Sequence, residues 1–243
     1  MKPESRDKVL KHLGAARLEP YLAEAGGNKK AALNLYRWSV QLTASVQQLL
    51  GLTEVMLRNS IDEQLQLWNN ETRGEETSWL LEEPANPLRS LVEDKRKRAH
   101  HDAEKALTIR PPGHPRHGDE LTHDDVLSHT MFGMWKDLLP NHAPNMSQED
   151  QRNQNRLRMW NESLSAAFPH AEDPDGQKTY WRVAHLHLLR NRVSHMDSLL
   201  NVDVDDRAND AFDLVGSIDP VLRNWLTGTS TVSQILNQKP EVR

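Results

Sequence analysis

The sequence predicts an all-α protein, and two observations carry this prediction. Apolar residues recur at spacings of three and four along most of the 243 residues, which is the period of a helix that packs on a core. The alternation of apolar and polar residues typical of strands is almost absent, and Tyr and Phe occur only three times each. With 37% hydrophobic residues the chain can bury one good core, so we expect a single all-α domain over residues 1–243.

Residues 1–28 predict two short helices. The first covers Asp7–Leu13 and is expected to end at Gly14. The second covers Leu18–Ala25 and is expected to end at Gly26 and Gly27, because glycine is the residue that most often follows a helix.

Two longer helices are expected next, at the start of a core over residues 29–200. Lys29–Leu50 carries an apolar stripe and is expected to end at Gly51. Thr53 is then a suitable N-cap for a second helix over Glu54–Trp68.

One side of this second helix carries charged residues at spacings of four, namely Glu54, Arg58 and Asp62. Residues four apart are neighbours on a helix surface, so this spacing suits a salt-bridge ladder. A place for Glu54 and Arg58 in an active site is the alternative, and the spacing alone does not separate the two.

Residues 69–120 predict a polar insertion. It begins with a loop over Asn69–Asn86, continues with a charged helix over Pro87–Leu107 and is broken over Arg110–Gly118 by proline and glycine. A capping box at Thr122 and Asp125 then opens a helix expected to run to Pro140.

The remaining elements are also helical. They are expected over Gln148–Phe168, Trp181–Leu200, Asp205–Ser217, Pro220–Leu226 and Val232–Leu236, with a turn over Asp173–Gly176. The last three form a C-terminal group over residues 201–243.

The helix over Trp181–Leu200 has two faces. One is an apolar stripe for the core, formed by Val183, Leu186, Leu189, Val193, Met196 and Leu200. The opposite face is mixed and carries Ala184, His187, Leu188, Asn191, His195 and Leu199. A face that is too polar for a core and too apolar for solvent alone predicts contact with a partner.

Composition excludes several classes of function. The chain has no cysteine, which excludes disulfides and thiolate chemistry, and no apolar run approaches the length of a membrane span. A net charge of -5 argues against a protein that coats nucleic acid with a broad basic surface. His185 and His187 point about 200° apart on a helix, so they cannot easily share a metal ion. The sequence also has no Gly-rich phosphate loop. We expect no metal and no cofactor. We expect a cytoplasmic protein with no membrane partner.

Three segments together resemble the Abi-like proteins of the HEPN superfamily. Residues 189–195 (LRNRVSH) match the superfamily's R-N-x-x-x-H signature, residues 52–61 (LTEVMLRNSI) are similar to a helix of the family, and residues 132–139 (FGMWKDLL) are similar to a further segment. Many relatives place a second histidine and Glu-Pro after the signature, whereas Met196 and Asp197 follow it here.

The resemblance implies a HEPN-like antiparallel helical bundle, with additional helices at both termini and in long insertions. It implies a metal-independent endoribonuclease of a phage-defence or toxin–antitoxin system. Two protomers of a homodimer would line one cleft with both copies of the motif. RNA is then the substrate, and an antitoxin or a nucleotidyltransferase-type protein is the further partner that the resemblance suggests.

The residues of the motif suit RNA cleavage without a metal. Histidine titrates near neutral pH, so two copies of His195 can share the work of base and acid. Arg190 is suited to binding phosphate oxygens in a bidentate manner, and Asn191 is expected to orient His195 through a side-chain hydrogen bond. Glu54 and Arg58 are auxiliary candidates. The alternative is a non-catalytic helical module that binds RNA or a protein partner through the same face.

Overall fold

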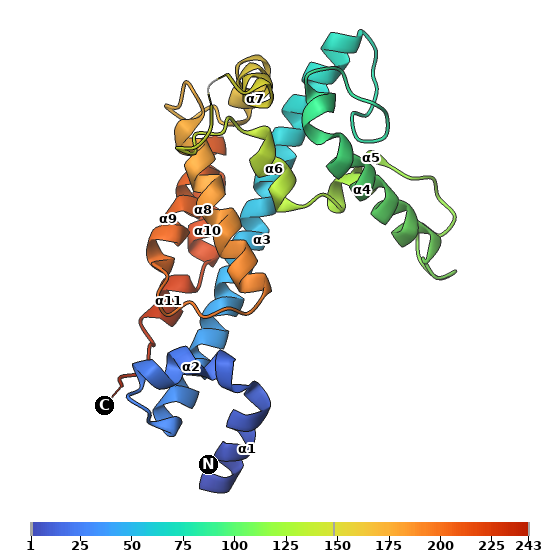
Figure 1. Ribbon diagram of the computed structural model, residues 1–243. Coiled ribbons are helices and arrows are strands. Elements are labelled where there is room, and N and C mark those ends of the chain that lie inside the picture. Colours follow the sequence, from blue (N-terminus) through green and yellow to red (C-terminus); the bar gives the residue numbers. More distant parts are fainter. Residues whose placement is uncertain (1, 148, 243) are drawn as a thin grey trace. The chain divides into compact units, whose positions relative to one another are not determined.

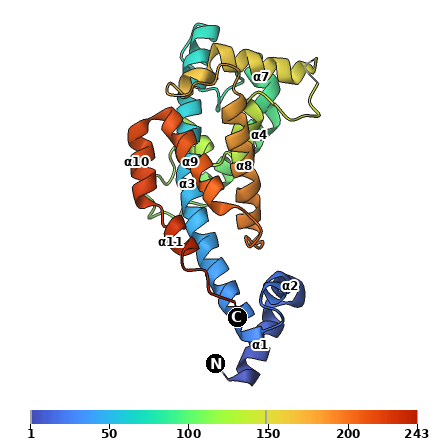
Figure 2. The ribbon, with the colours of Figure 1, turned by 90° about the vertical axis from the view of Figure 1, so that its left-hand side faces the viewer.

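The computed structural model describes residues 2–147 and 149–242, and all regular structure in these ranges is helical (Figures 1 and 2). The prediction of an all-α protein is therefore confirmed. The helices and the one 3-10 helix, η1, are α1 (Pro3–Leu13), α2 (Ala15–Glu24), α3 (Lys29–Arg73), α4 (Leu88–Thr108), α5 (His123–Ser128), α6 (Phe132–Leu138), α7 (Gln151–Glu162), η1 (Leu164–Ala167), α8 (Gln177–Ser194), α9 (Val204–Ile218), α10 (Pro220–Thr229) and α11 (Val232–Leu236). Within the described ranges, no helix combines the length and the apolar character that crossing a lipid bilayer requires.

By its internal contacts the chain divides into two compact units. Unit 1 comprises Met1–Thr53, His185–Gly216 and Val221–Arg243, and unit 2 comprises Glu54–Ala184 and Ser217–Pro220. The single domain expected over residues 1–243, with a core at 29–200, stays a prediction.

The two short N-terminal helices are confirmed as α1 and α2. α1 begins at Pro3, four residues before the expected start, because proline is tolerated in the first turn, where its missing N–H has no helical partner. Gly14 separates the two helices with φ +85°, a left-handed conformation that favours glycine.

The break expected at Gly51 is wrong, because α3 runs without interruption from Lys29 to Arg73. A glycine inside a helix costs only about 1 kcal/mol relative to alanine, and the buried side chains of Leu49 and Leu50 offset that cost. Thr53 is also no N-cap. It is fully buried, and its hydroxyl donates to the carbonyl oxygen of Leu49 at 2.8 Å within the same helix.

The single helix expected from Thr122 to Pro140 is instead two helices, α5 and α6. The capping box at Thr122 and Asp125 is present, as predicted. α5 ends early because nearby side chains bind its last carbonyl groups: Ser128 donates to Asp125 at 2.7 Å, and Thr130 to Leu127 at 2.7 Å. Such local side-chain bonds compete with continuation of the helix.

The helix expected over Gln148–Phe168 is also shorter than predicted. Gln148 lies outside the described residues, and α7 begins at Gln151 with Asp150 as its N-cap, whose carboxylate accepts the amide of Asn153 at 2.7 Å. α7 ends where Ser163 adopts φ -148° and donates to the carbonyl oxygen of Gln64 at 3.0 Å.

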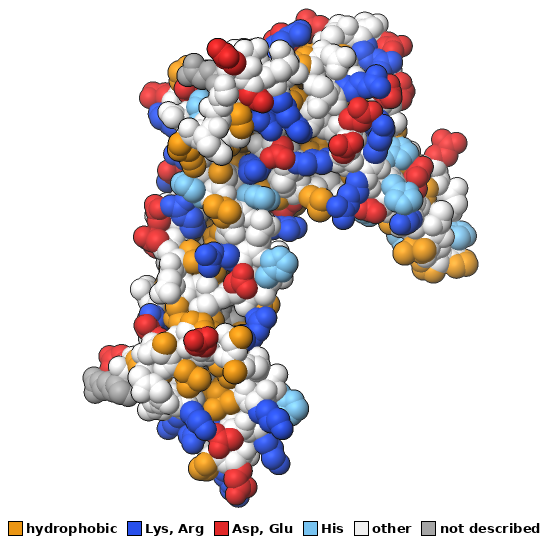
Figure 3. Space-filling model, in the orientation of Figure 1, with side chains coloured by type: hydrophobic (Ala, Val, Ile, Leu, Met, Phe, Trp, Pro, Cys, Tyr) orange, Lys and Arg blue, Asp and Glu red, His pale blue; other side chains and the backbone are white. Residues whose placement is uncertain are grey.

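Unit 1 is held together by contacts between α2, the start of α3 and the C-terminal helices. The rings of Tyr21 and Tyr36 meet edge-on with centroids 5.3 Å apart, and the hydroxyl of Tyr21 lies 2.8 Å from that of Ser39. At the other end, Trp38 donates its indole N–H to the carbonyl oxygen of Ile235 in α11 at 2.7 Å. α1 has no buried residue, and the groove of about 1020 Å³ beside it and α2 shows apolar side chains among charged ones (Figure 3).

Unit 2 is built around α4, which contacts α5, α6 and α7. Trp79 and Trp135 are fully buried and meet edge-on with centroids 6.4 Å apart. Asp125 is buried at the start of α5 and accepts hydrogen bonds from Arg110 at 2.7 Å and from both Arg116 terminal nitrogens at 2.8 Å. The Arg116 guanidinium, together with Thr122 and Arg110, holds the pKa of the Asp125 carboxyl well below its usual range against the opposing effect of burial.

Candidate functional site

The helix with the predicted motif, α8, starts and ends earlier than the expected range Trp181–Leu200. Its start is fixed by Asp173, whose carboxylate accepts the amides of Lys178 at 3.0 Å and Thr179 at 2.8 Å. The predicted turn over Asp173–Gly176 is confirmed, with φ +74° at Gly176.

The end of α8 is a Schellman motif formed by the residues around His195. The amide of Met196 donates to the carbonyl oxygen of Val193 at 3.1 Å, and that of Asp197 to Arg192 at 2.9 Å. Met196 takes the left-handed position with φ +55°, the one described residue other than glycine with a positive φ. The amide of His195 still donates to Asn191 at 3.1 Å, so His195 closes the last turn of the helix.

The two faces predicted for α8 are found in part. Leu186, Leu189 and Val193 are buried, as the apolar stripe predicts. Met196 is 40% exposed, because the helix ends before this residue and the apolar stripe does not extend beyond the helix. On the opposite face Leu188 is 64% exposed, whereas Leu199, which the same periodicity places there, is buried beyond the helix end.

The side chains of the motif reach the surface. Arg190 and Asn191 are half-buried and His195 is exposed. None of the three side chains forms a hydrogen bond or an ion pair with another residue in the ranges 2–147 and 149–242. The hydrogen bond expected from Asn191 to His195 is therefore not formed here, and all three groups are accessible to a ligand.

The auxiliary candidates, Glu54 and Arg58, lie half-buried on the part of α3 that belongs to unit 2. Arg190, Asn191 and His195 belong to unit 1. Arg58 donates to its neighbour Asn59 at 3.4 Å. Asp62, the third member of the predicted ladder, binds Trp79 and His123 instead. A shared role of Glu54 and Arg58 with the motif stays a prediction.

A pocket of about 510 Å³ adjoins the end of α8 in unit 1. It is lined by Gly14, Arg17 and Tyr21 from the N-terminal helices and by Met196, Asp197 and Ser198, the residues directly after His195. The guanidinium of Arg17 donates to the carbonyl oxygen of Met196 at 2.7 Å. The pocket thus places one further cation beside the segment that follows the motif.

Another part of α8 carries a network of polar side chains. Nδ1 of His185 lies 3.0 Å from the carboxylate of Asp210 in α9, which also binds Arg207 at 2.6 Å. Burial raises the pKa of the Asp210 carboxyl above its usual range, against the opposing effects of Arg207 and His185. In the part of the chain that the structure describes, no three His, Asp or Glu side chains are grouped as a metal site requires.

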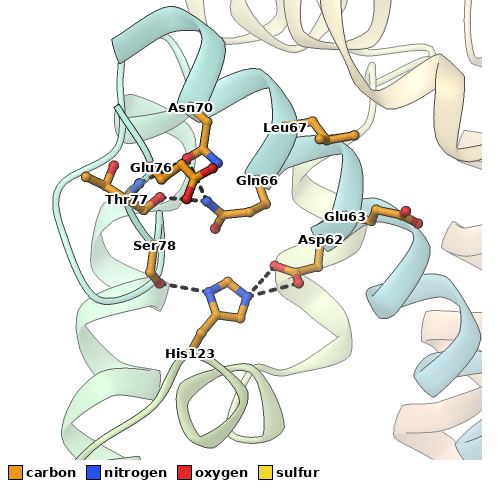
Figure 4. Close-up of a pocket in the computed structure, with 9 residues that line it drawn as sticks. All are labelled: Asp62, Glu63, Gln66, Leu67, Asn70, Glu76, Thr77, Ser78 and His123. Carbon is orange, nitrogen blue, oxygen red and sulfur yellow. Dashed lines mark hydrogen bonds and ion pairs between the residues drawn. The ribbon is translucent and has the colours of Figure 1, made fainter. Parts of the chain in front are cut away.

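A second polar cluster, which the sequence does not predict, lies in unit 2 and is shown in Figure 4. His123 Nδ1 lies 2.7 Å from the hydroxyl of Ser78, and its Nε2 lies 2.9 Å and 3.0 Å from the two carboxylate oxygens of Asp62. All three residues line a pocket of about 490 Å³. His123 is 61 residues from Asp62 and 45 from Ser78 in the sequence, so no local spacing signals the cluster.

Comparison with protein families, with curated proteins and with solved structures finds no match for this chain.

Proposed function

We propose that the protein is a metal-independent endoribonuclease of the HEPN type, of a phage-defence or toxin–antitoxin system, in which Arg190 and His195 act on the RNA phosphate. One observation carries the proposal: both side chains reach the surface from the last turn of α8, and no partner within the described ranges occupies them. A catalytic Arg and His held in internal ion pairs would be less free to meet a substrate. The resemblance of residues 189–195 to the R-N-x-x-x-H signature supports the same reading.

Each residue has a role in this chemistry. His195 takes the proton of the ribose 2′-hydroxyl, and the copy in a second protomer returns a proton to the departing 5′-oxygen. Arg190 neutralises the charge that grows on the phosphate oxygens. Asn191, one turn before His195, orients the imidazole once substrate is bound. The product is a 2′,3′-cyclic phosphate on one fragment and a 5′-hydroxyl on the other.

The mixed face of α8 fits a homodimer in which both copies of the motif line one cleft. Leu188, exposed in the single chain, is an apolar contact for such an interface. The proposal further includes an antitoxin or a nucleotidyltransferase-type partner that inhibits the ribonuclease activity.

The experiment is incubation of purified full-length protein with total RNA in EDTA, followed by mapping of the cleaved ends. We expect cyclic phosphate ends from the wild type and a loss of about 100-fold or more in His195→Ala and Arg190→Ala. Arg192→Ala and His101→Ala are matched controls, because Arg192 and His101 are exposed and lie outside the proposed machinery.

Three results would count against the nuclease. These are 3′-hydroxyl ends, cleavage that needs a divalent cation, and equal cleavage by wild type and both motif variants. RNA binding without cleavage would instead favour the alternative, a non-catalytic module that uses the same face of α8.

A further inference from the structure

The second polar cluster brings together a hydroxyl, an imidazole and a carboxylate from three separate segments of unit 2 (Figure 4). Asp62 comes from α3, Ser78 from the loop after α3, and His123 from the first turn of α5. We propose that these residues form a nucleophilic site in which Ser78 accepts the acyl group of a neutral or cationic ester. None of the three residues is assigned to the proposed RNA site, and the proposal does not depend on that site.

The partners of His123 decide which of its nitrogens carries a proton. A carboxylate only accepts hydrogen bonds, so Nε2, at 2.9 Å from Asp62, carries a hydrogen. In the neutral ring Nδ1 then has a free lone pair. The Ser78 oxygen accepts the amide of Leu81 at 3.1 Å, which leaves the Ser78 hydroxyl to donate to Nδ1 at 2.7 Å. The arrangement is that of a nucleophile, a base and a group that orients the base.

The carboxylate of Asp62 is itself held in place. The indole N–H of Trp79, a fully buried residue, donates to one of its oxygens at 2.8 Å. The side chains of Asp62 and His123 are only 14% and 23% exposed. A pre-oriented, partly desolvated pair of this kind strengthens the pull on the Ser78 proton.

The pocket beside the cluster defines the class of substrate. Its volume of about 490 Å³ lies within the range of pockets that hold small organic molecules. Leu67 lines it and is 59% exposed, which provides an apolar surface for an acyl or aryl group. Glu63 and Glu76 also line it, and their exposed carboxylates repel anionic substrates.

The reaction is an acyl transfer. The Ser78 oxygen forms a bond with the carbonyl carbon of the ester while its proton passes to Nδ1 of His123. The bond between that carbon and the alcohol oxygen then breaks, and the departing alcohol takes the proton from His123. Water repeats the two steps in place of Ser78, which releases a carboxylic acid and restores the serine.

We expect this acylation to be slow. Catalysis of acyl transfer depends strongly on donors for the oxygen that becomes negatively charged. The nearby amide group of Gln66 is already bound, because its nitrogen donates to Thr77 at 2.6 Å and to Asn70 at 2.8 Å. A single covalent event is therefore a better measurement than turnover.

The same unit contains a matched control. The hydroxyl of Ser128 lies 3.1 Å from Nδ1 of His129, but that nitrogen also lies 2.8 Å from the carbonyl oxygen of Asp125. Because a carbonyl only accepts, Nδ1 of His129 carries the hydrogen and cannot serve as a base for Ser128. Ser128 is exposed, so greater accessibility to a reagent could not explain a preferential reaction at Ser78.

The test is reaction of the full-length protein with an alkyl fluorophosphonate, in which the Ser78 oxygen bonds to phosphorus and fluoride leaves. Peptide mass spectrometry then locates the adduct. We expect the adduct on Ser78 and not on Ser128, and a rate about 100-fold lower in His123→Gln. Asp62→Asn is expected to lower the rate as well, because it no longer fixes the proton on Nε2. Ser128→Ala is expected to react like the wild type.

Three results would overturn the proposal. The first is wild-type protein with no adduct on Ser78, a result that does not depend on whether any variant folds. The second is labelling of Ser78 at the wild-type rate in His123→Gln that retains the thermal unfolding midpoint of the wild type. The third is hydrolysis of p-nitrophenyl acetate at equal rates by wild type and folded Ser78→Ala.

Discussion

The guanidinium of Arg17 donates a hydrogen bond of 2.7 Å to the carbonyl oxygen of Met196, the residue that follows His195. The bond ties the end of α8 to α2 within unit 1. It also satisfies the carbonyl group of a residue in the left-handed conformation, which no helical partner serves. A residue far from the motif in the sequence therefore contacts the segment that directly follows it.

We expect Arg17→Ala to loosen the end of α8. The loss of one hydrogen bond at an exposed site lowers the free energy of unfolding by about 0.5–1 kcal/mol, and the amides of Met196 and Asp197 exchange faster with solvent deuterium. Hydrogen exchange with peptide resolution measures this. Arg37→Ala, at an exposed arginine of α3, is the control and leaves these amides unchanged. Equal protection in both variants would show that the bond has no structural effect.

Met196→Gly is expected to stabilise the protein. A non-glycine residue in the left-handed region costs about 1–2 kcal/mol, and glycine loses about 0.5–1 kcal/mol in chain entropy, so the net gain is about 0.5–1 kcal/mol. Urea unfolding measures the difference. Ser194→Gly, two residues earlier and still helical, is expected to lower the free energy of unfolding by about 0.5 kcal/mol. A loss of stability in Met196→Gly would mean that the side chain contributes more than the backbone strain costs.

Glycine also shows how much of the fold could be predicted from the sequence. Gly14 ends a helix at φ +85°, and Gly51 lies inside one, although both interrupt helical patterns in the same way. Local signals that act over three or four residues, such as the capping box at Thr122 and Asp125, were predicted correctly. The end of α8 was not, because a methionine in the left-handed position gives no sequence signal.

The two candidate sites also differ in how far their residues lie apart in the sequence. Arg190, Asn191 and His195 are close in sequence, so their place near the end of one helix could be predicted from spacing. Asp62, Ser78 and His123 are joined only by the packing of α3, the loop after it and α5. Their contacts depend on tertiary structure, which single-sequence periodicity does not encode.

The continuity of α3 leads to a prediction at Gly51. A side chain at this position meets nothing within 4 Å, so Gly51→Ala is expected to raise the free energy of unfolding by about 1 kcal/mol. Gly26→Ala is the contrasting variant. A side chain at Gly26 also meets nothing within 4 Å, but Gly26 has φ +55°, so this variant is expected to lower the free energy of unfolding by about 1 kcal/mol. Thermal unfolding of both variants is the measurement. Destabilisation by Gly51→Ala would indicate a break in the helix.

Asp125 leads to a prediction about pH. Asp125→Asn is expected to lower the free energy of unfolding by about 2 kcal/mol at pH 7, because Arg110 and Arg116 lose their charged partner. The pKa of Asp125 is lowered in the folded protein. Its contribution is therefore complete above about pH 5 and is lost as the pH falls toward the folded-state pKa.

Urea titrations from pH 7 to pH 3 measure the difference in free energy of unfolding between wild type and Asp125→Asn. This difference is expected to become smaller as the pH falls. Asp119→Asn is the control, because Asp119 also pairs with Arg116 but is 54% exposed, and it is expected to change stability by less than about 0.5 kcal/mol. A constant difference across the pH range would contradict the assignment.

The shared cleft of the proposed ribonuclease can be tested by mixing variants. A His195→Ala homodimer lacks both the base and the acid, so it is not expected to cleave RNA. After equal amounts of wild type and His195→Ala are unfolded and refolded together, about half of the dimers carry one chain of each kind. Such a dimer keeps one His195 and lacks the group for the other proton transfer. We therefore expect the wild-type chains in the mixture to show about half of the activity that they show when refolded alone. Chains that act singly would keep all of their activity after mixing. Size-exclusion chromatography of each sample separates this result from a failure to form dimers.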